Sequence, residues 1–137
     1  MGNSPDIRKN KGEPQKKTFQ IITKSQEFSA VLYSYLAKSE KEYRSSICQK
    51  VQEYSLNVIH CARMANSYEL HDEGREKAHK KTMEFMNRIE DLLPVLRRLK
   101  CITDEQESDL MRRLNALKNG YSRWIESDAK RLDQSGV

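Results

Sequence analysis

The chain has 137 residues, a length that suits one domain with room for a hydrophobic core. Its 25 Lys and Arg residues outnumber its 20 Asp and Glu residues, so the net charge is +5. Charged residues make up 33% of the chain while glycine and proline are scarce, which favours an all-α protein and argues against a β-sandwich. The basic excess points mildly to a polyanionic partner, although it would serve solubility equally well.

Cysteine usage and the polar start of the chain indicate a cytoplasmic protein. Cys48, Cys61 and Cys101 are odd in number and form no CxxC motif, so we expect free thiols in a reducing compartment. The first fifteen residues are polar, unlike a secretory signal, and Asp6 stands where a myristoylation motif requires Ser or Thr. No apolar run is long enough to span a membrane.

Residues 1–16 are expected to form a disordered basic tail, because they combine two prolines, two glycines and several cations with almost nothing to bury. The first helix is predicted over about residues 17–38. Its apolar positions follow a spacing of four and three, and neighbouring residues broaden that face. The positions are Ile21, Phe28, Leu32 and Tyr35, broadened by Ile22, Val31 and Leu36.

The second helix is predicted over about residues 42–68 and carries the most regular pattern in the chain. Its seam alternates steps of four and three without interruption. The seam residues are Ile47, Val51, Tyr54, Val58, Cys61, Ala65 and Tyr68. The small side chains of Cys61, Ala62 and Ala65 would allow a neighbouring helix to approach closely there.

The third helix is predicted over about residues 72–100, with acidic residues in its first turn and basic residues in its last, as the helix dipole favours. Its predicted seam consists of Ala78, Phe85, Ile89, Leu92, Leu96 and Leu99. Pro94 falls opposite this seam, where it can bend the helix without entering the core.

The fourth helix is predicted to begin at Thr103, which forms a capping box with Gln106. Its seam consists of Leu110, Leu114, Leu117, Tyr121 and Trp124. The next positions of the same spacing are Asp128 and Arg131, so the apolar stripe stops at Trp124. Residues 132–137 are expected to form a disordered C-terminal tail.

Four amphipathic helices with short connections predict an all-α fold, an antiparallel up-down-up-down four-helix bundle over residues 17–131. The alternative is a long antiparallel coiled-coil hairpin, which the two interior turns disfavour. Neither a strand pattern nor an internal repeat is evident.

Catalytic and metal-binding patterns are incomplete. Glu76-x-x-His79 matches half of a di-iron carboxylate site, but the second Glu-x-x-His and the further glutamates are missing, so we expect a solvated or partly packed His79. Cys48 and Cys61 lie nearly four helical turns apart and cannot share one zinc ion. We therefore expect a protein without catalytic residues, cofactor or metal.

Basic residues offer the better candidate site, for phosphates of a nucleic acid. The third and fourth helices carry cations that project away from the seams or flank them. These candidates are Lys77, Lys80, Lys81, Arg97, Arg98, Arg112, Arg113, Arg123 and Lys130. In an antiparallel hairpin Arg97 and Arg98 would come within reach of Arg112 and Arg113 and form one cationic face. The alternative is a salt-bridged solvent face, because acidic residues are interspersed.

The order of these segments resembles a known family. Lys17–Ile22 opens the fold, the long periodic helix follows, and then come the leucine-rich turn 92–96, the capped start at Thr103 and a last helix with Trp124-Ile125. This arrangement resembles the accessory variability determinant (Avd) family of diversity-generating retroelements. It is also similar to the four-helix proteins encoded in ribosomal RNA intervening sequences. The resemblance covers about residues 17–126.

Gly-Arg often stands five or six residues before the tryptophan in the Avd family. This chain has Lys118 and Asn119 there, with a glycine at Gly120 instead. The resemblance implies a basic, barrel-shaped homopentamer that binds RNA or DNA and a partner reverse transcriptase in cDNA synthesis, with no catalytic site of its own. The alternative function is a helical protein-protein scaffold with no specific nucleic-acid role.

Overall fold

The computed structural model describes the backbone of residues 13–134 and the side chains from Gln20 to Gln134. Helix α2 runs over Glu13–Leu36 and therefore begins before the predicted Lys17. Pro14 lies in its first turn, where the fixed φ of proline suits a helix. The rest of the predicted N-terminal tail, residues 1–12, lies outside the described residues.

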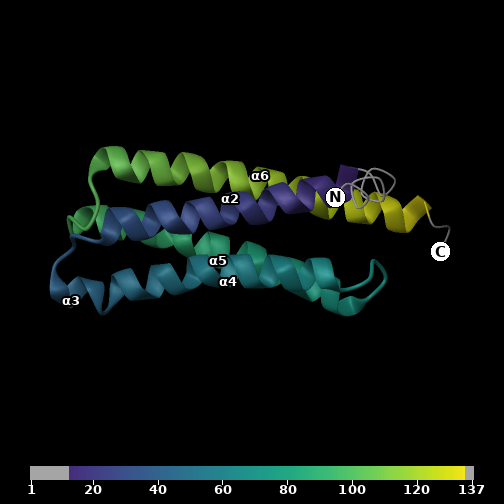
Figure 1. The fold of residues 1–137 in the computed structure, drawn as a ribbon, viewed down its shortest axis with the longest axis horizontal. Helices are drawn as coiled ribbons and strands as arrows, with labels where there is room; N and C mark the ends of the chain where they lie inside the picture. The colour runs from purple at the N-terminus through teal and green to yellow at the C-terminus, as the bar shows by residue number, and fades with distance from the viewer. Residues whose placement is uncertain (1–12, 135–137) are drawn as a thin grey trace, which may run out of the picture.

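Four long helices run along the molecule, joined by short connections (Figure 1). Besides α2 they are α4 (Ile47–Ser67), α5 (Glu73–Arg98) and α6 (Asp104–Gln134), and a one-turn helix α3 (Lys41–Arg44) precedes α4. Because α6 extends to Gln134, the first part of the predicted C-terminal tail is helical; residues 135–137 lie outside the described residues. The four-helix bundle is confirmed.

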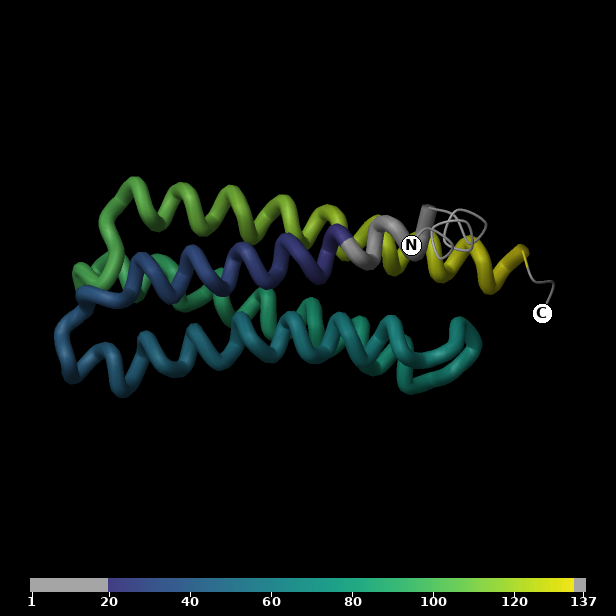
Figure 2. The backbone as a smooth tube through the Cα atoms, viewed as in Figure 1, coloured from purple at the N-terminus to yellow at the C-terminus, as the bar shows by residue number. Residues whose placement is uncertain are grey.

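Each long helix packs against two of the others. Helix α4 contacts α2 and α5, and α6 contacts α5 and α2, so successive helices are neighbours and the last closes against the first. Figure 2 shows the chain reversing direction at each connection, which is the up-down-up-down arrangement. The hairpin alternative is excluded because all four helices share one core.

The apolar stripe of α6 is buried as predicted. Every position of the predicted seam is at most 4% exposed, and Tyr121 and Trp124 are among the largest fully buried side chains. Burial does not stop there, however, because Asp128 is also buried. The apolar stripe therefore stops at Trp124 as predicted, but the packed face continues to Asp128, for a reason that the polar contacts below supply.

Helix α4 differs from its prediction in two ways. The chain breaks at Ser45 and Ser46, whose hydroxyls bond to the carbonyl oxygens of Lys41 and Glu42 and so compete with helix formation. The buried face is also rotated, because α4 packs against α2 on one side and α5 on the other. Its buried residues are Cys48, Val51, Ser55, Val58, Ala62 and Ala65, while Ile47, Tyr54, Cys61 and Tyr68 are only partly buried.

Helix α5 keeps half of its predicted seam. Ala78, Ile89 and Leu96 are buried, whereas Phe85, Leu92 and Leu99 are partly exposed. The remaining buried positions are Arg75, His79, Thr82, Met86 and Leu93. Pro94 lies inside the helix at a partly exposed position, clear of the buried seam. Helix α2 buries Ile21, Phe28 and Leu32 as predicted, but Tyr35 is only partly buried.

The connection between α5 and α6 is closed by backbone and side-chain bonds. The predicted capping box is confirmed: the Gln106 amide donates to Thr103 Oγ1 and the Thr103 amide donates to Gln106 Oε1, both at 3.0 Å. Just before it, the Cys101 amide donates to the Leu96 carbonyl at 2.8 Å, and Lys100 adopts the left-handed φ of 63°. A lysine is strained in that conformation, which glycine adopts freely.

Replacing Lys100 by Gly should raise the free energy of unfolding by up to about 1 kcal/mol, because it relieves the left-handed strain. The matched control Lys81→Gly, at an exposed position inside α5, should lower it by about 1 kcal/mol. Denaturant unfolding followed by circular dichroism measures both changes. Loss of stability in both variants would show that the turn at Lys100 is unstrained.

Candidate functional site

A buried polar network joins α5 to α6 in the half of the bundle that holds the start of α5. It consists of Arg75, His79 and Thr82 from α5 and Tyr121 and Asp128 from α6. All five residues are at most 8% exposed. The three α5 residues follow spacings of four and three, and the two α6 residues are seven positions apart, so the network occupies one seam of each helix.

The ion pair between Arg75 and Asp128 is the strongest contact of the network. Arg75 Nε donates to Asp128 Oδ2 at 2.7 Å and Nη2 donates to Oδ1 at 2.9 Å, the parallel geometry in which guanidinium and carboxylate bind most firmly. The third nitrogen, Nη1, donates to the Tyr68 carbonyl at 3.0 Å, just beyond the end of α4. Arg75 thus connects three helices through one side chain.

His79 is fixed through both ring nitrogens. Nε2 lies 2.7 Å from Asp128 Oδ2, and because the carboxylate only accepts, Nε2 carries the proton. Nδ1 lies 2.7 Å from the hydroxyl of Tyr121, which in turn lies 3.3 Å from Thr82 Oγ1. Thr82 donates to the Ala78 carbonyl at 2.8 Å, so the chain of bonds ends on the backbone of α5.

Electrostatics hold Asp128 in its charged form. Burial raises the pKa of this carboxyl, but the hydrogen bonds from His79 and Arg75, with the charge of the guanidinium, outweigh it and bring the pKa to about 2. Burial also raises the pKa of the neighbouring Tyr121 phenol, and there it is not outweighed, so the hydroxyl stays protonated. The network therefore retains one carboxylate charge against the Arg75 guanidinium.

Trp124 packs over this network. Its ring meets His79 edge-on at 4.6 Å between centroids and Tyr121 at 5.0 Å, and the Arg75 guanidinium lies 5.4 Å from the ring centre. The indole Nε1 is buried and has no hydrogen-bond partner among the described residues. The large ring screens the ion pair from water, which strengthens the attraction between its charges.

The network holds the helices together and leaves little room for a reaction. His79 is 5% exposed and both of its nitrogens are bonded, so a substrate could reach it only by displacing those bonds. The prediction of a solvated or partly packed His79 is wrong, because Asp128 and Tyr121 replace the water it would lose. The sequence signal was present in Asp128 at the next seam position of α6, but its partners on α5 could not be read from α6 alone.

The described residues contain neither a metal-binding cluster nor a disulfide. Among the side chains described from Gln20 to Gln134, no group of three His, Cys, Asp or Glu residues is arranged to hold a metal ion. The three cysteines are unpaired, and Cys48 and Cys101 are buried. Burial is the main cause that raises the pKa of Cys101 to about 11, so this thiol stays protonated near neutral pH.

The candidate cations fall into two groups far apart along the bundle. Lys77, Lys80 and Lys81 lie near the start of α5, and Arg123 and Lys130 lie near the end of α6 at the same end of the molecule (Figure 1). Arg97, Arg98, Arg112 and Arg113 lie around the connection between α5 and α6 at the other end. The rise of a helix separates Lys81 from Arg97 by about 24 Å.

Most of the second group is already paired. Arg97 lies 2.7 Å from Glu107, and Arg112 and Arg113 both bind Asp109, which also accepts a bond from the Tyr35 hydroxyl. The Tyr35 hydrogen bond and the Arg113 contact lower the pKa of Asp109 and keep it charged. These arginines are neutralised locally, as expected of a salt-bridged solvent face.

The first group is free of such pairing. Lys77, Lys80, Lys81, Arg123 and Lys130 are exposed and form no ion pair with another described residue. Lys80 and Lys81 border a hollow beside Ile125, between α5 and α6. Arg123 faces the opposite side of α6, toward α2, and Lys130 follows it two turns later on the same side. The unpaired cations therefore flank α6 on both sides.

The fold and these contacts define a four-helix bundle with a buried ionic network and cationic surfaces at one end. No helix within the described residues combines the length and apolarity needed to cross a membrane. The chain matches no known protein-family model, and neither the curated proteins nor the solved structures give a match.

Replacing Asp128 by Asn should lower the free energy of unfolding by about 3–5 kcal/mol at neutral pH, because Arg75 would stay buried without its counter-charge. In the unaltered protein the contribution of Asp128 is present above the ordinary carboxyl pKa of 3.8 and is lost as pH falls through about 2. Denaturant unfolding from neutral pH to about pH 2 measures both effects.

The matched control is Asp133→Asn, an exposed carboxylate near the end of the same helix, which should change stability by less than about 0.5 kcal/mol. Equal stability of the Asp128→Asn and Asp133→Asn variants at neutral pH would contradict a stabilising role for the buried ion pair.

Proposed function

We propose that this protein is a non-catalytic, cytoplasmic bundle that binds RNA or DNA through unpaired cations near the start of α5 and the end of α6. The observation that carries the proposal is the contrast between the two groups of cations. Lys77, Lys80 and Lys81 are exposed without acidic partners, whereas Arg97, Arg112 and Arg113 are neutralised by nearby carboxylates. An unpaired lysine can release the counterions of a phosphate without first breaking a salt bridge.

The shape of the molecule supports a backbone-binding role. A straight bundle offers rigid helix faces, and side chains on such faces bind phosphates without reading bases. Helix α2 also begins at this end.

The resemblance to the Avd family supports a specific role for this nucleic-acid binding. It supports a role as an accessory protein that holds a reverse transcriptase on its nucleic-acid template during cDNA synthesis. The protein itself would supply charge and shape, and its partner would supply the chemistry. The closed state of the His79 network agrees with a non-catalytic role.

A protein-protein scaffold is the second candidate function. Tyr33, Leu56, Met64 and Val95 are large apolar side chains that remain between 37% and 46% exposed. They come from three different helices, α2, α4 and α5, and single exposed apolar residues are common on monomeric proteins. These residues nevertheless offer contacts for another protein, including further copies of this chain.

Substituting Lys77, Lys80 and Lys81 together by Gln should weaken binding to a structured RNA by about tenfold or more. It should also reduce the slope of log affinity against log salt by about one for each of these lysines that binds a phosphate. Fluorescence anisotropy across a salt series measures both quantities. Circular dichroism checks that the variant remains folded.

The control is the triple variant Arg97→Gln, Arg112→Gln, Arg113→Gln, which removes the same charge from the paired group. It should weaken binding less than the lysine variant does. Equal losses would show that only net charge matters. Failure of the unaltered protein to bind at low salt would refute the proposed function and favour the scaffold.

Assembly gives an independent check, because the resemblance implies a homopentamer. Light scattering at micromolar concentration should show a particle of several chains, each of 16.1 kDa. Substituting the exposed Leu56 and Met64 by Ser reveals whether the outer face of α4 contributes to that assembly. A strict monomer would contradict the Avd-like role.

A further inference from the structure

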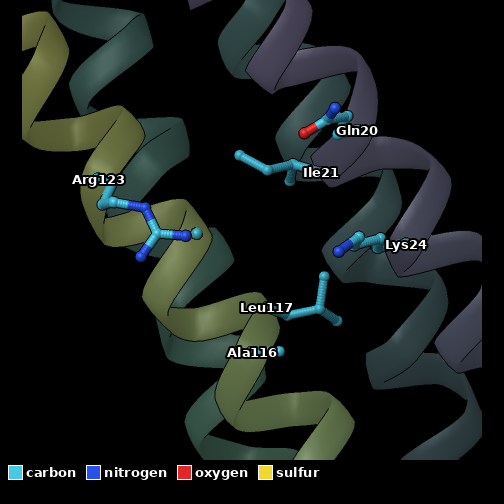
Figure 3. Close-up of a pocket in the computed structure, with 7 residues that line it drawn as sticks. Gln20, Ile21, Lys24, Ala116, Leu117 and Arg123 are labelled. Atoms are coloured by element: carbon cyan, nitrogen blue, oxygen red, sulfur yellow. The ribbon is translucent and has the colours of Figure 1, made fainter.

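A groove between α2 and α6 has the chemistry of an anion site. It encloses about 150 Å³ and is lined by three α2 residues, Gln20, Ile21 and Lys24, and four α6 residues, Ala116, Leu117, Gly120 and Arg123. Figure 3 shows Lys24 reaching from α2 and Arg123 reaching from α6 toward the space between the helices. The floor is apolar and the two walls each carry a cation.

Gly120 keeps this groove open, and packing within the chain does not require it. A Cβ built at Gly120 would meet only Arg123 Nη2, at 3.9 Å, which is an ordinary contact. At Gly74, by contrast, a Cβ would lie 2.7 Å from the ring of Tyr68, so that glycine is needed for the fold. A glycine inside a helix costs about 0.5–1 kcal/mol relative to alanine. The open space at Gly120 therefore carries a cost without a packing benefit.

Charge distinguishes this groove from the other hollows of the surface. None of its seven lining residues is acidic, and neither Lys24 nor Arg123 forms an ion pair with another described residue. Three other hollows on the described surface each include at least one carboxylate, from Glu53, from Glu76 and Glu84, or from Asp104, Glu105 and Asp109. The two cations of this groove have no acidic neighbour in its lining, whereas the charges of the other hollows cancel or are net negative, so this groove attracts an anion most strongly.

We infer that this groove binds the sugar-phosphate backbone of a nucleic-acid strand, with Lys24 and Arg123 on one phosphate. Guanidinium groups match phosphate oxygens in a planar, paired geometry, and a lysine adds a point charge from the other wall. The absent side chain of Gly120 leaves room for the sugar over Ile21 and Leu117. The inference rests on the proposed nucleic-acid binding and adds Lys24 and Gly120 to its residues.

A polymer of phosphates fits better than an isolated anion. Lys130 stands on the same side of α6 as Arg123, two turns further on, which places it about 10 Å along the helix. Lys130 therefore extends the cationic side of α6 beyond the groove that Lys24 and Arg123 line. A nucleic-acid strand presents charges at regular intervals, so it could contact both the groove and Lys130.

Three variants test the groove by anisotropy with the same structured RNA. Gly120→Leu fills the groove and keeps every charge, and it should weaken binding about tenfold. The double variant Lys24→Gln, Arg123→Gln should weaken binding similarly and lower the salt slope by about one, because both cations contact the same phosphate. Gly120→Ala adds only one methyl group to the groove, so it should weaken binding less than Gly120→Leu does. It should also unfold at higher denaturant concentration, because its Cβ fits.

The outcomes separate this inference from the proposed function. If the unaltered protein binds RNA and the Lys77, Lys80, Lys81 variant binds weakly while the groove variants bind normally, the function stands and the groove inference fails. If the unaltered protein does not bind, both fail. A change in particle mass with unchanged RNA affinity would mean that a second copy occupies the groove. Equal affinity for poly-glutamate would assign it to an acidic peptide; either result overturns the inference.

Discussion

The buried pair of Arg75 and Asp128 is the contact on which the arrangement of three helices depends. One guanidinium reaches the carboxylate of α6 with two nitrogens and the carbonyl after α4 with the third. Removing charges from water is costly, so such a pair is stable only where every donor and acceptor has a counterpart. His79 and Tyr121 supply the remaining bonds, and Trp124 covers them. The end of α6 is therefore fixed by polar contacts where its apolar stripe has run out.

The apolar pattern predicted the number and the direction of the helices, and it located the packed face of α6 well. Leu110, Leu114 and Leu117 lie on a helix whose buried face is continuous, so spacing alone was sufficient. Helix α4 was harder because it packs against two neighbours. Its buried arc is centred on small residues such as Ser55 and Ala62, while the larger Tyr54 flanks the core. A prediction that ranks residues by size and apolarity therefore places the buried face of such a helix at the wrong angle around the helix axis.

The polar network could not be predicted in the same way, since its members look like surface residues until the helices are paired. The role of His79 on α5 is evident only when its contacts with Asp128 and Tyr121 on α6 are known. The same holds for the charged surface. Arg112 and Arg113 are cations in the sequence, but Asp109 neutralises them in the fold, whereas Lys80 and Lys81 remain unpaired. Which cations are available to a ligand is a property of the bundle.

The buried hydroxyls between α2 and α4 have a consequence for how the bundle chooses its alignment. Ser55 donates to the Gln52 carbonyl, so Ser29 donates to Ser55 at 2.9 Å, deep between two otherwise apolar faces. Apolar faces tolerate sliding, since a shift of one turn, about 5.4 Å, exchanges one aliphatic contact for another. A hydroxyl pair does not, because sliding would leave the buried Ser29 hydroxyl without its acceptor on α4. The hydrogen bond between Ser29 and Ser55 therefore fixes the axial position of α2 against α4.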